Sequence, residues 1–197
     1  ELTRLRAALA AQMQAAGDLG LLPERELHAR SAGSTPYAIA TDARLNPFAD
    51  LQRAAALANR LDPREVPGLT ALLRADDSAV RWWGALGLLA LGADAAPARA
   101  ALLTALADLS PDVRLTAAEA LVRLEGADRA LPVLEAALRS GDIFARFIAL
   151  NAAHRLGPLA RPLLPSIRAA KLVSPENKDM TDYVGRMVEY LPARLGG

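Results

Sequence analysis

Histidine is the side chain most often used to move protons or bind metals near neutral pH, and this chain has two, His28 and His154. They stand in unrelated contexts, so a two-histidine mechanism or a histidine metal site has little basis. Cysteine is absent, which excludes thiolate metal sites and cysteine nucleophiles. There is no glycine-rich phosphate loop and no G-x-S-x-G motif, and the acidic residues are dispersed. The sequence therefore predicts no catalytic, metal or cofactor site in this chain.

Composition narrows the class of protein further. Hydrophobic residues make up 52% of the 197 positions but aromatic residues only 4%, and this alanine- and leucine-rich content favours closely packed helices over sheets. Lys and Arg (23) nearly balance Asp and Glu (22), so no broad positive field is available to attract nucleic acid. No apolar run approaches the roughly 20 residues that cross a bilayer, and no signal-peptide pattern is present. We expect an all-α protein with no nucleic-acid partner and no membrane span, and the compartment and oligomeric state stay open.

Internal repetition is the main organising signal. Three stretches align on an arginine that recurs at steps of 33 and 32 residues, at Arg81, Arg114 and Arg146. Upstream of each lies a second helical stretch with a proline in or near its first turn, where a missing amide is tolerated. Repeats of this length are typical of α-solenoids, in which each helix pair buries its apolar face against the next pair.

The sequence therefore predicts a right-handed α-solenoid. We expect an unpaired first helix and then four helix pairs: 48–61, then 66–75 with 79–91, 95–107 with 112–125, 128–139 with 143–156, and 158–171 with 180–191. Short turns with Asp, Ser and Gly join the two helices of the first three pairs, as capping residues do at helix starts. A longer polar linker, 174–179, is expected in the last pair.

The chain divides into two parts on this basis. Residues 48–197 form the repeat domain, whereas residues 1–47 do not repeat and combine a helix at 2–16 with an extended arm, with helical turns at 24–30 and 37–41. The arm either packs on the first repeat or bridges to another domain. Because the chain begins at Glu1 directly in a helical pattern, we expect it to be a segment of a longer protein, with 1–47 the end of a missing catalytic domain.

The helix faces predict an interaction surface. The second helix of each pair has small and apolar residues along its core face, but the opposite face of the first copy is also apolar, with Trp82, Leu86 and Leu89. That face should form the concave surface of the solenoid, where contiguous apolar groups mark a contact site. The predicted interaction strip continues into the later copies with Leu115, Glu119, Phe147 and Asn151. The alternative is that residues 19–47 cover this strip within the same chain.

The repeated arginines favour a structural role. Asp76 and Asp108 precede Arg81 and Arg114 by five and six residues. We expect a ladder of Asp–Arg contacts between adjacent repeats that includes Arg146, and ligand binding by these residues is the alternative.

The repeats resemble a known pattern, D-x-x-V-R-x-x-A-x-x-A-L-x-x-L-G. It is clearest in the second copy, with Asp112-Val113-Arg114 followed by Ala117, Ala120-Leu121 and Leu124. This is similar to HEAT and phycobilisome-lyase-like repeats. The resemblance implies an armadillo-like helical fold and says little about function.

The stretches around the repeats resemble the C-terminal region of bacterial sulfatase-like hydrolases of the alkaline-phosphatase superfamily. The matching stretches are 17–28, 34–37, 80–89 and 177–184. The resemblance implies a parent enzyme that hydrolyses sulfate esters or sulfamates with formylglycine and calcium, is often exported, and has its catalytic domain before this chain. The chemistry does not carry over, because the nearest motif, Ser34-Thr35-Pro36-Tyr37-Ala38, has alanine where the formylglycine motif needs arginine.

Three functions follow as alternatives. The first is a non-catalytic HEAT-repeat domain that contacts its own sulfatase catalytic domain, or another protein, through the concave face. The second is a free-standing scaffold that binds a protein partner. The third, a helical-repeat DNA glycosylase, requires a basic groove and is disfavoured by the near-neutral charge.

Overall fold

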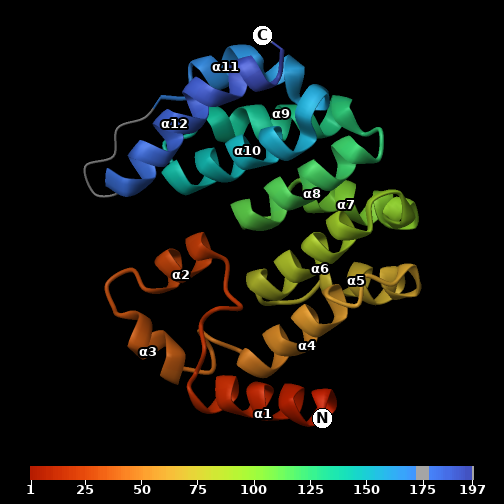
Figure 1. Cartoon of the computed structure of the whole chain (residues 1–197), viewed down its shortest axis with the longest axis vertical. Coiled ribbons are helices and arrows are strands. Elements are labelled where there is room, and N and C mark those ends of the chain that lie inside the picture. The colour runs from red at the N-terminus through yellow and green to blue at the C-terminus, as the bar shows by residue number, and fades with distance from the viewer. Residues whose placement is uncertain (172–177, 197) are drawn as a thin grey trace.

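The computed structural model describes residues 1–171 and 178–196, and within these ranges it consists of helices joined by turns, with no strand. Helix pairs stack along the long axis of the molecule, from α4 near one end to α11 and α12 at the other (Figure 1). The repeat region contains α4 (Phe48–Ala58), α5 (Val66–Leu72), α6 (Ser78–Leu91), α7 (Arg99–Ala105), α8 (Pro111–Arg123), α9 (Ala127–Arg139), α10 (Ile143–Leu156), α11 (Leu164–Arg168) and α12 (Lys178–Arg194). The arm contains α1 (Leu2–Ala15), α2 (Glu24–Arg30) and α3 (Pro36–Thr41).

The four helix pairs are α5 with α6, α7 with α8, α9 with α10, and α11 with α12, and α4 packs on the first pair. The second helices form a row in which α8 contacts α6 and α10, and α10 contacts α12. One hydrophobic core runs from Ala58 to Leu195 through all four pairs. The all-α solenoid predicted from the repeat period is therefore confirmed. Most of the predicted linker 174–179 lies outside the described residues.

A close approach between α5 and α6 depends on a glycine. A Cβ built on Gly84 would lie 2.8 Å from the carbonyl oxygen of Leu69 and 2.9 Å from Cβ of Leu72. Because real Cβ atoms do not approach other atoms this closely, a side chain at this position would force the two helices apart. The small residues on the core face of the first copy thus set the helix spacing.

Two segments predicted as the starts of α-helices are 3₁₀-helices instead, at Gly92–Ala98 and Gly157–Leu163. Each begins with a glycine at φ 57°, which turns the chain after α6 or α10. Each contains a proline, Pro97 or Pro162, which cannot donate an amide hydrogen bond. The α-helical parts of the first helices in these pairs, α7 and α11, are therefore shorter than the sequence pattern indicates.

The arm packs on the first helix pair. Leu22 and Ile39 form a second core cluster with Leu51, Ala79 and Val80 of α4 and α6. The indole nitrogen of Trp83 on α6 donates a hydrogen bond of 2.9 Å to the carbonyl of Leu21. Helix α1 has no buried residue. Of the two alternatives for the arm, packing on the first repeat is the one observed for residues 19–41.

The stretch Ser78–Ala105 is long and apolar enough to cross a membrane by length and composition, contrary to the expectation from the sequence. In the structure it is divided at Gly92 between α6 and the next pair. Its buried leucines, Leu88 and Leu102, belong to the hydrophobic core. Core helices of other proteins meet the same criteria, although only 33% of the most apolar window is buried here.

Candidate interaction groove

The row of second helices is hollowed into a groove of about 660 Å³ that α2 borders on one side. Helix α6 and helix α10 supply half-buried apolar side chains, and α8 between them supplies the more deeply buried polar ones. The groove thus has apolar sides and a polar floor. The principal lining residues are Trp82, Leu86 and Leu89 on α6, Asp112, Thr116 and Glu119 on α8, and Phe144, Phe147, Ile148 and Asn151 on α10.

The groove brings together six of the seven residues of the predicted interaction strip: Trp82, Leu86, Leu89, Glu119, Phe147 and Asn151. The strip was predicted from sequence periodicity, and the structure places these six side chains along one continuous surface. Leu22 and Pro23 of the arm line one border, but Trp82 remains partly exposed. The arm therefore forms a side of the groove and leaves it open.

Leu115 does not belong to this surface. Its side chain is only 2% exposed and lies beside Pro132 and Val133 of α9, on the other side of α8. Helix α8 is the central helix, with α6 and α10 on its flanks and α9 behind it, so a leucine at this position is covered. The next residue, Thr116, takes the place in the groove that the strip assigned to Leu115.

A larger cavity of about 1010 Å³ lies between the end of the arm and the turn that joins α5 to α6. Its arginines already have acidic partners: Arg53 pairs with Asp50, and Arg60 pairs with Glu65 at 2.5 Å. The first pair is exposed to solvent and the second is partly exposed. This cavity offers no buried group in need of a ligand, so we treat the smaller groove as the candidate site.

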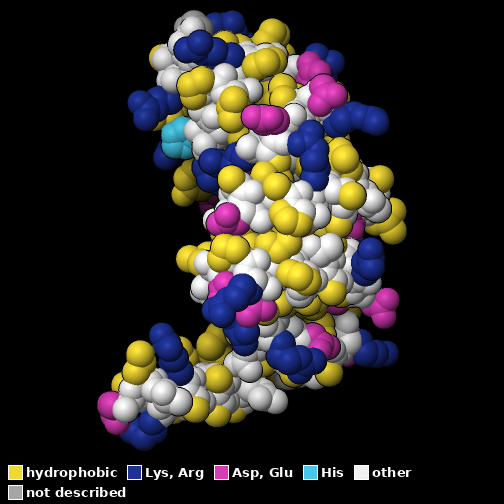
Figure 2. Space-filling view, turned by 90° about the vertical axis from the view of Figure 1, so that its right-hand side faces the viewer, with side chains coloured by type: hydrophobic (Ala, Val, Ile, Leu, Met, Phe, Trp, Pro, Cys, Tyr) yellow, Lys and Arg dark blue, Asp and Glu magenta, His cyan; other side chains and the backbone are white. Residues whose placement is uncertain are grey.

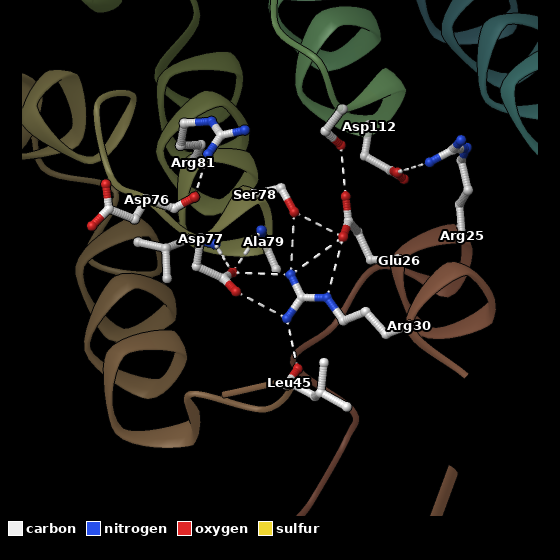
Figure 3. A network of polar contacts seen from close by, with 12 residues as sticks. Arg25, Glu26, Arg30, Leu45, Asp76, Asp77, Ser78, Ala79, Arg81 and Asp112 are labelled. Atoms are coloured by element: carbon white, nitrogen blue, oxygen red, sulfur yellow. Dashed lines mark hydrogen bonds and ion pairs between the residues drawn. The ribbon is translucent and has the colours of Figure 1, made fainter. Parts of the chain in front are cut away.

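Helix α2 crosses the start of α6 and the start of α8. Glu26, 7% exposed, accepts hydrogen bonds from the hydroxyls of Ser78 (2.8 Å) and Ser110 (2.7 Å), which begin these two helices. Arg30 lies one turn further along α2, 2.9 Å from the carboxylate of Asp77, the N-cap residue of α6 (Figure 3). The i, i+4 spacing puts Glu26 and Arg30 on one face of α2, so both reach the helix starts together.

The same helix also reaches α10. Arg25 donates a hydrogen bond of 2.7 Å to Asp142, the N-cap residue of α10, and the His28 ring packs on Phe144 at 4.7 Å between centroids. Helix α2 thus connects the first turns of three successive repeats. Sequence reasoning did not identify this role, although Arg25, Glu26 and Arg30 are all charged residues on one short helix.

Asp112 is a buried acidic residue of the groove, and one of its carboxylate oxygens accepts no hydrogen bond within the described ranges. The residue is 3% exposed, and its buried Oδ2 atom has no hydrogen-bond partner among the described residues. The nearest cation is Nη1 of Arg25, at 3.8 Å. Burial and, to a lesser extent, the negative charge of Glu26 raise the pKa of Asp112 to about 6, while Arg25 acts in the opposite direction.

Glu119, in contrast, is fully paired. Its carboxylate is 1% exposed and accepts two hydrogen bonds from Arg155 of α10, at 2.8 and 2.5 Å. Arg123, one turn further along α8, lies 3.5 Å from the same carboxylate. The hydrogen bonds to Glu119 raise the pKa of the Arg155 guanidinium. At this end of the groove the buried carboxylate therefore already has two cationic partners.

The predicted arginine ladder is only partly composed of Asp–Arg pairs. Arg81 makes a bidentate pair with Asp108 of the next repeat, at 2.7 and 2.8 Å. The Asp76 side chain is exposed and forms no such pair, since Arg81 contacts its main-chain carbonyl. Arg114 donates to main-chain carbonyls in the turn before α8. Arg146 donates to main-chain carbonyls in the turn before α10 and in the segment after α11. The recurring function is therefore to satisfy carbonyl groups at turns.

The repeat region is similar to a known family. Residues 66–154 match the family described as HEAT repeats. The matched segment runs from the start of α5 into the last turn of α10. It therefore includes all of α6 and α8 and most of α10, the three helices that line the groove. A search of curated proteins finds no match. HEAT repeats commonly mediate contacts between proteins and are typically not catalytic.

The two histidines lie apart, and no group of three or more potential metal ligands occurs in residues 1–171 and 178–196. His28 packs on Phe144, and His154 lies 5.6 Å from the Tyr190 ring of α12. Both are engaged in ring contacts that hold helices together.

Proposed function

We propose that this chain is a non-catalytic protein-binding module whose groove receives an apolar segment of a partner protein. The observation that supports the proposal is the row of half-buried apolar side chains, Trp82, Leu86, Leu89 and Phe147, in an open groove of about 660 Å³. Burial of apolar area drives such contacts at about 25 cal/mol per Å², and large side chains in pockets dominate them.

The proposal has a direct test in a pair of variants. Leu86→Glu places a charge among the apolar sides of the groove, whereas Leu109→Glu changes a leucine that is 93% exposed in the turn before α8. Peptides selected from a random 12-residue display library on the whole chain should bind the Leu109→Glu variant normally. They should bind the Leu86→Glu variant at least ten-fold more weakly. Equal binding to both variants would place the contact outside the groove.

We further propose, from the resemblance described above, that the partner is the catalytic domain of a sulfatase in the same polypeptide. That domain, and not this chain, would hold the formylglycine and calcium. The exposed leucines of α1, Leu2 (61%), Leu5 (50%) and Leu9 (60%), are a second apolar surface available for such a contact. The encoding gene tests this part: a formylglycine motif in frame before Glu1 supports it, and its absence refutes it in favour of a separate scaffold protein.

A further inference from the structure

The two ends of the groove differ in charge. Two carboxyl groups and one guanidinium group line the end next to α2, whereas one carboxyl and two guanidinium groups line the end near the last turns of α8 and α10. The first set is Glu24, Arg25 and Asp112, and the second is Glu119, Arg123 and Arg155. On the side of the molecule that faces away from α2, by contrast, basic and acidic side chains are interspersed (Figure 2). The second set therefore forms an arginine end of the groove with an excess of positive charge.

The two guanidinium groups are held in place but remain accessible. Arg155 is fixed by its two hydrogen bonds to Glu119, and Nη2 of Arg123 donates a hydrogen bond of 2.9 Å to the main-chain carbonyl of Arg155. The side chains of Arg123 and Arg155 are nevertheless 39% and 51% exposed. Nη1 of Arg155, and Nε and Nη1 of Arg123, donate no hydrogen bond to any described residue. The arginine end thus offers positioned N–H donors on side chains that a ligand in the groove can reach.

One carboxylate balances only one of these two cations. Glu119 is 1% exposed, whereas both arginines reach the surface of the groove, so a second carboxylate would have to come from a molecule that occupies the groove. The planar guanidinium group matches the two oxygens of a carboxylate. Apolar residues of the same ligand would cover Leu86 and Phe147 and exclude water, and a charge pair is stronger where water is excluded.

We propose that Arg123 and Arg155 bind the carboxylate of a glutamate or aspartate side chain, so that the partner segment is an acidic peptide with apolar residues beside its acidic one. This inference rests on the proposed function of the groove. The charge at the two ends also orients the peptide, because an acidic residue next to α2 would meet Glu24 and Asp112. The acidic residue therefore lies at the arginine end, and the apolar residues lie along the middle of the groove toward α2.

The test uses two matched sets of acetylated, amidated hexapeptides on the whole chain. In one set a central glutamate is flanked by leucine, isoleucine or phenylalanine in all combinations, and in the other the isosteric glutamine replaces the glutamate. Binding of labelled peptides is measured by fluorescence anisotropy to the wild type, to Arg123→Gln, and to Arg129→Gln, which removes an exposed arginine of α9 as the control. Arg123→Gln leaves the two hydrogen bonds from Arg155 to Glu119 in place, so the buried carboxylate stays paired.

The expected result is that the best glutamate peptides bind the wild type and Arg129→Gln about ten-fold more tightly than their glutamine counterparts. For Arg123→Gln the two sets should differ by less than about three-fold, because Glu119 then balances the one remaining arginine. Binding without a glutamate preference, a preference that survives in Arg123→Gln, or one that Arg129→Gln also removes would overturn the carboxylate site and leave the protein-binding groove intact. Failure of both sets to bind, or occupation of the groove by a second copy of the chain in sedimentation experiments, would overturn both proposals.

Discussion

Replacing Asp112 with asparagine should stabilise the protein, and the gain should grow as the pH rises from 4.5 to 8. The side chain is buried on α8, and the charged groups that face it are Arg25 and Glu26 of α2 and Asp142 of α10. Burial and the two carboxylates outweigh the one arginine, so the folded protein holds the Asp112 proton more tightly than the unfolded chain.

The size of the effect follows from the pKa, which rises from 3.8 to about 6 on folding. Because the folded-state pKa is the higher one, ionisation begins to favour the unfolded chain near pH 4, and the loss of stability is complete above about pH 6. At about 1.4 kcal/mol per pKa unit, the ionised carboxyl costs about 1 kcal/mol at pH 4.5 and about 3 kcal/mol at pH 8. Asparagine has no proton to lose and avoids this cost.

Urea unfolding at pH 4.5, 6 and 8 measures this cost as a difference in the free energy of unfolding. The proteins compared are the wild type, Asp112→Asn and the exposed control Asp128→Asn. The free energy of unfolding of Asp112→Asn relative to the wild type should increase by about 2 kcal/mol between pH 4.5 and 8, while Asp128→Asn should show no comparable trend. A difference that is constant with pH, or that shrinks at pH 8, would refute the reasoning.

Three further sets of substitutions test the packing. Gly84→Ala should lower the free energy of unfolding by about 1–3 kcal/mol because its Cβ would meet the main chain of α5, whereas Gly185→Ala, with open space around its Cβ, should raise it by up to about 1 kcal/mol. Glu125→Gly should raise the midpoint of thermal unfolding, with a gain of about 1 kcal/mol, because Glu125 has a φ of 61° after α8. Separate and combined replacement of Arg81 and Asp108 by alanine should give a coupling energy of about 2 kcal/mol in urea, and a coupling near zero would mean that the pair does not join the repeats.

The repeat architecture could be predicted because it depends on local, periodic signals. The recurring arginines and the apolar faces of the second helices place the core and bring six strip residues into one groove. Leu115 lies outside the groove because α9 covers that side of α8, whereas Trp82 and Phe147 at the matching positions of α6 and α10 line the groove. A shift of one residue turns a side chain by about 100°, which is enough to exchange Leu115 for Thr116 in the groove.

The contacts of α2 could not be predicted in the same way. The pair of Arg25 with Asp142 joins residues 117 positions apart, and nothing periodic in the sequence indicates it. The repeat pattern includes Asp112, but the contacts of Asp112 and Ser110 with α2 depend on where the arm lies in space. The unmet Oδ2 atom of Asp112 is likewise a property of the tertiary environment, since the same residue exposed in a turn would bind water.

The bridging position of α2 also determines how the molecule responds to mechanical load. A solenoid bends through small rotations between neighbouring repeats. Here α2 fixes the N-terminal ends of α6, α8 and α10, and Glu119 with Arg155 fixes α8 to α10 near their other ends. The second half of α6 has no charged side chain that could make such a link to α8. Beyond Arg81, α6 therefore meets α8 without a charge pair, so pulling or bending should widen the groove between α6 and α8 beside Leu89 before it separates α8 from α10.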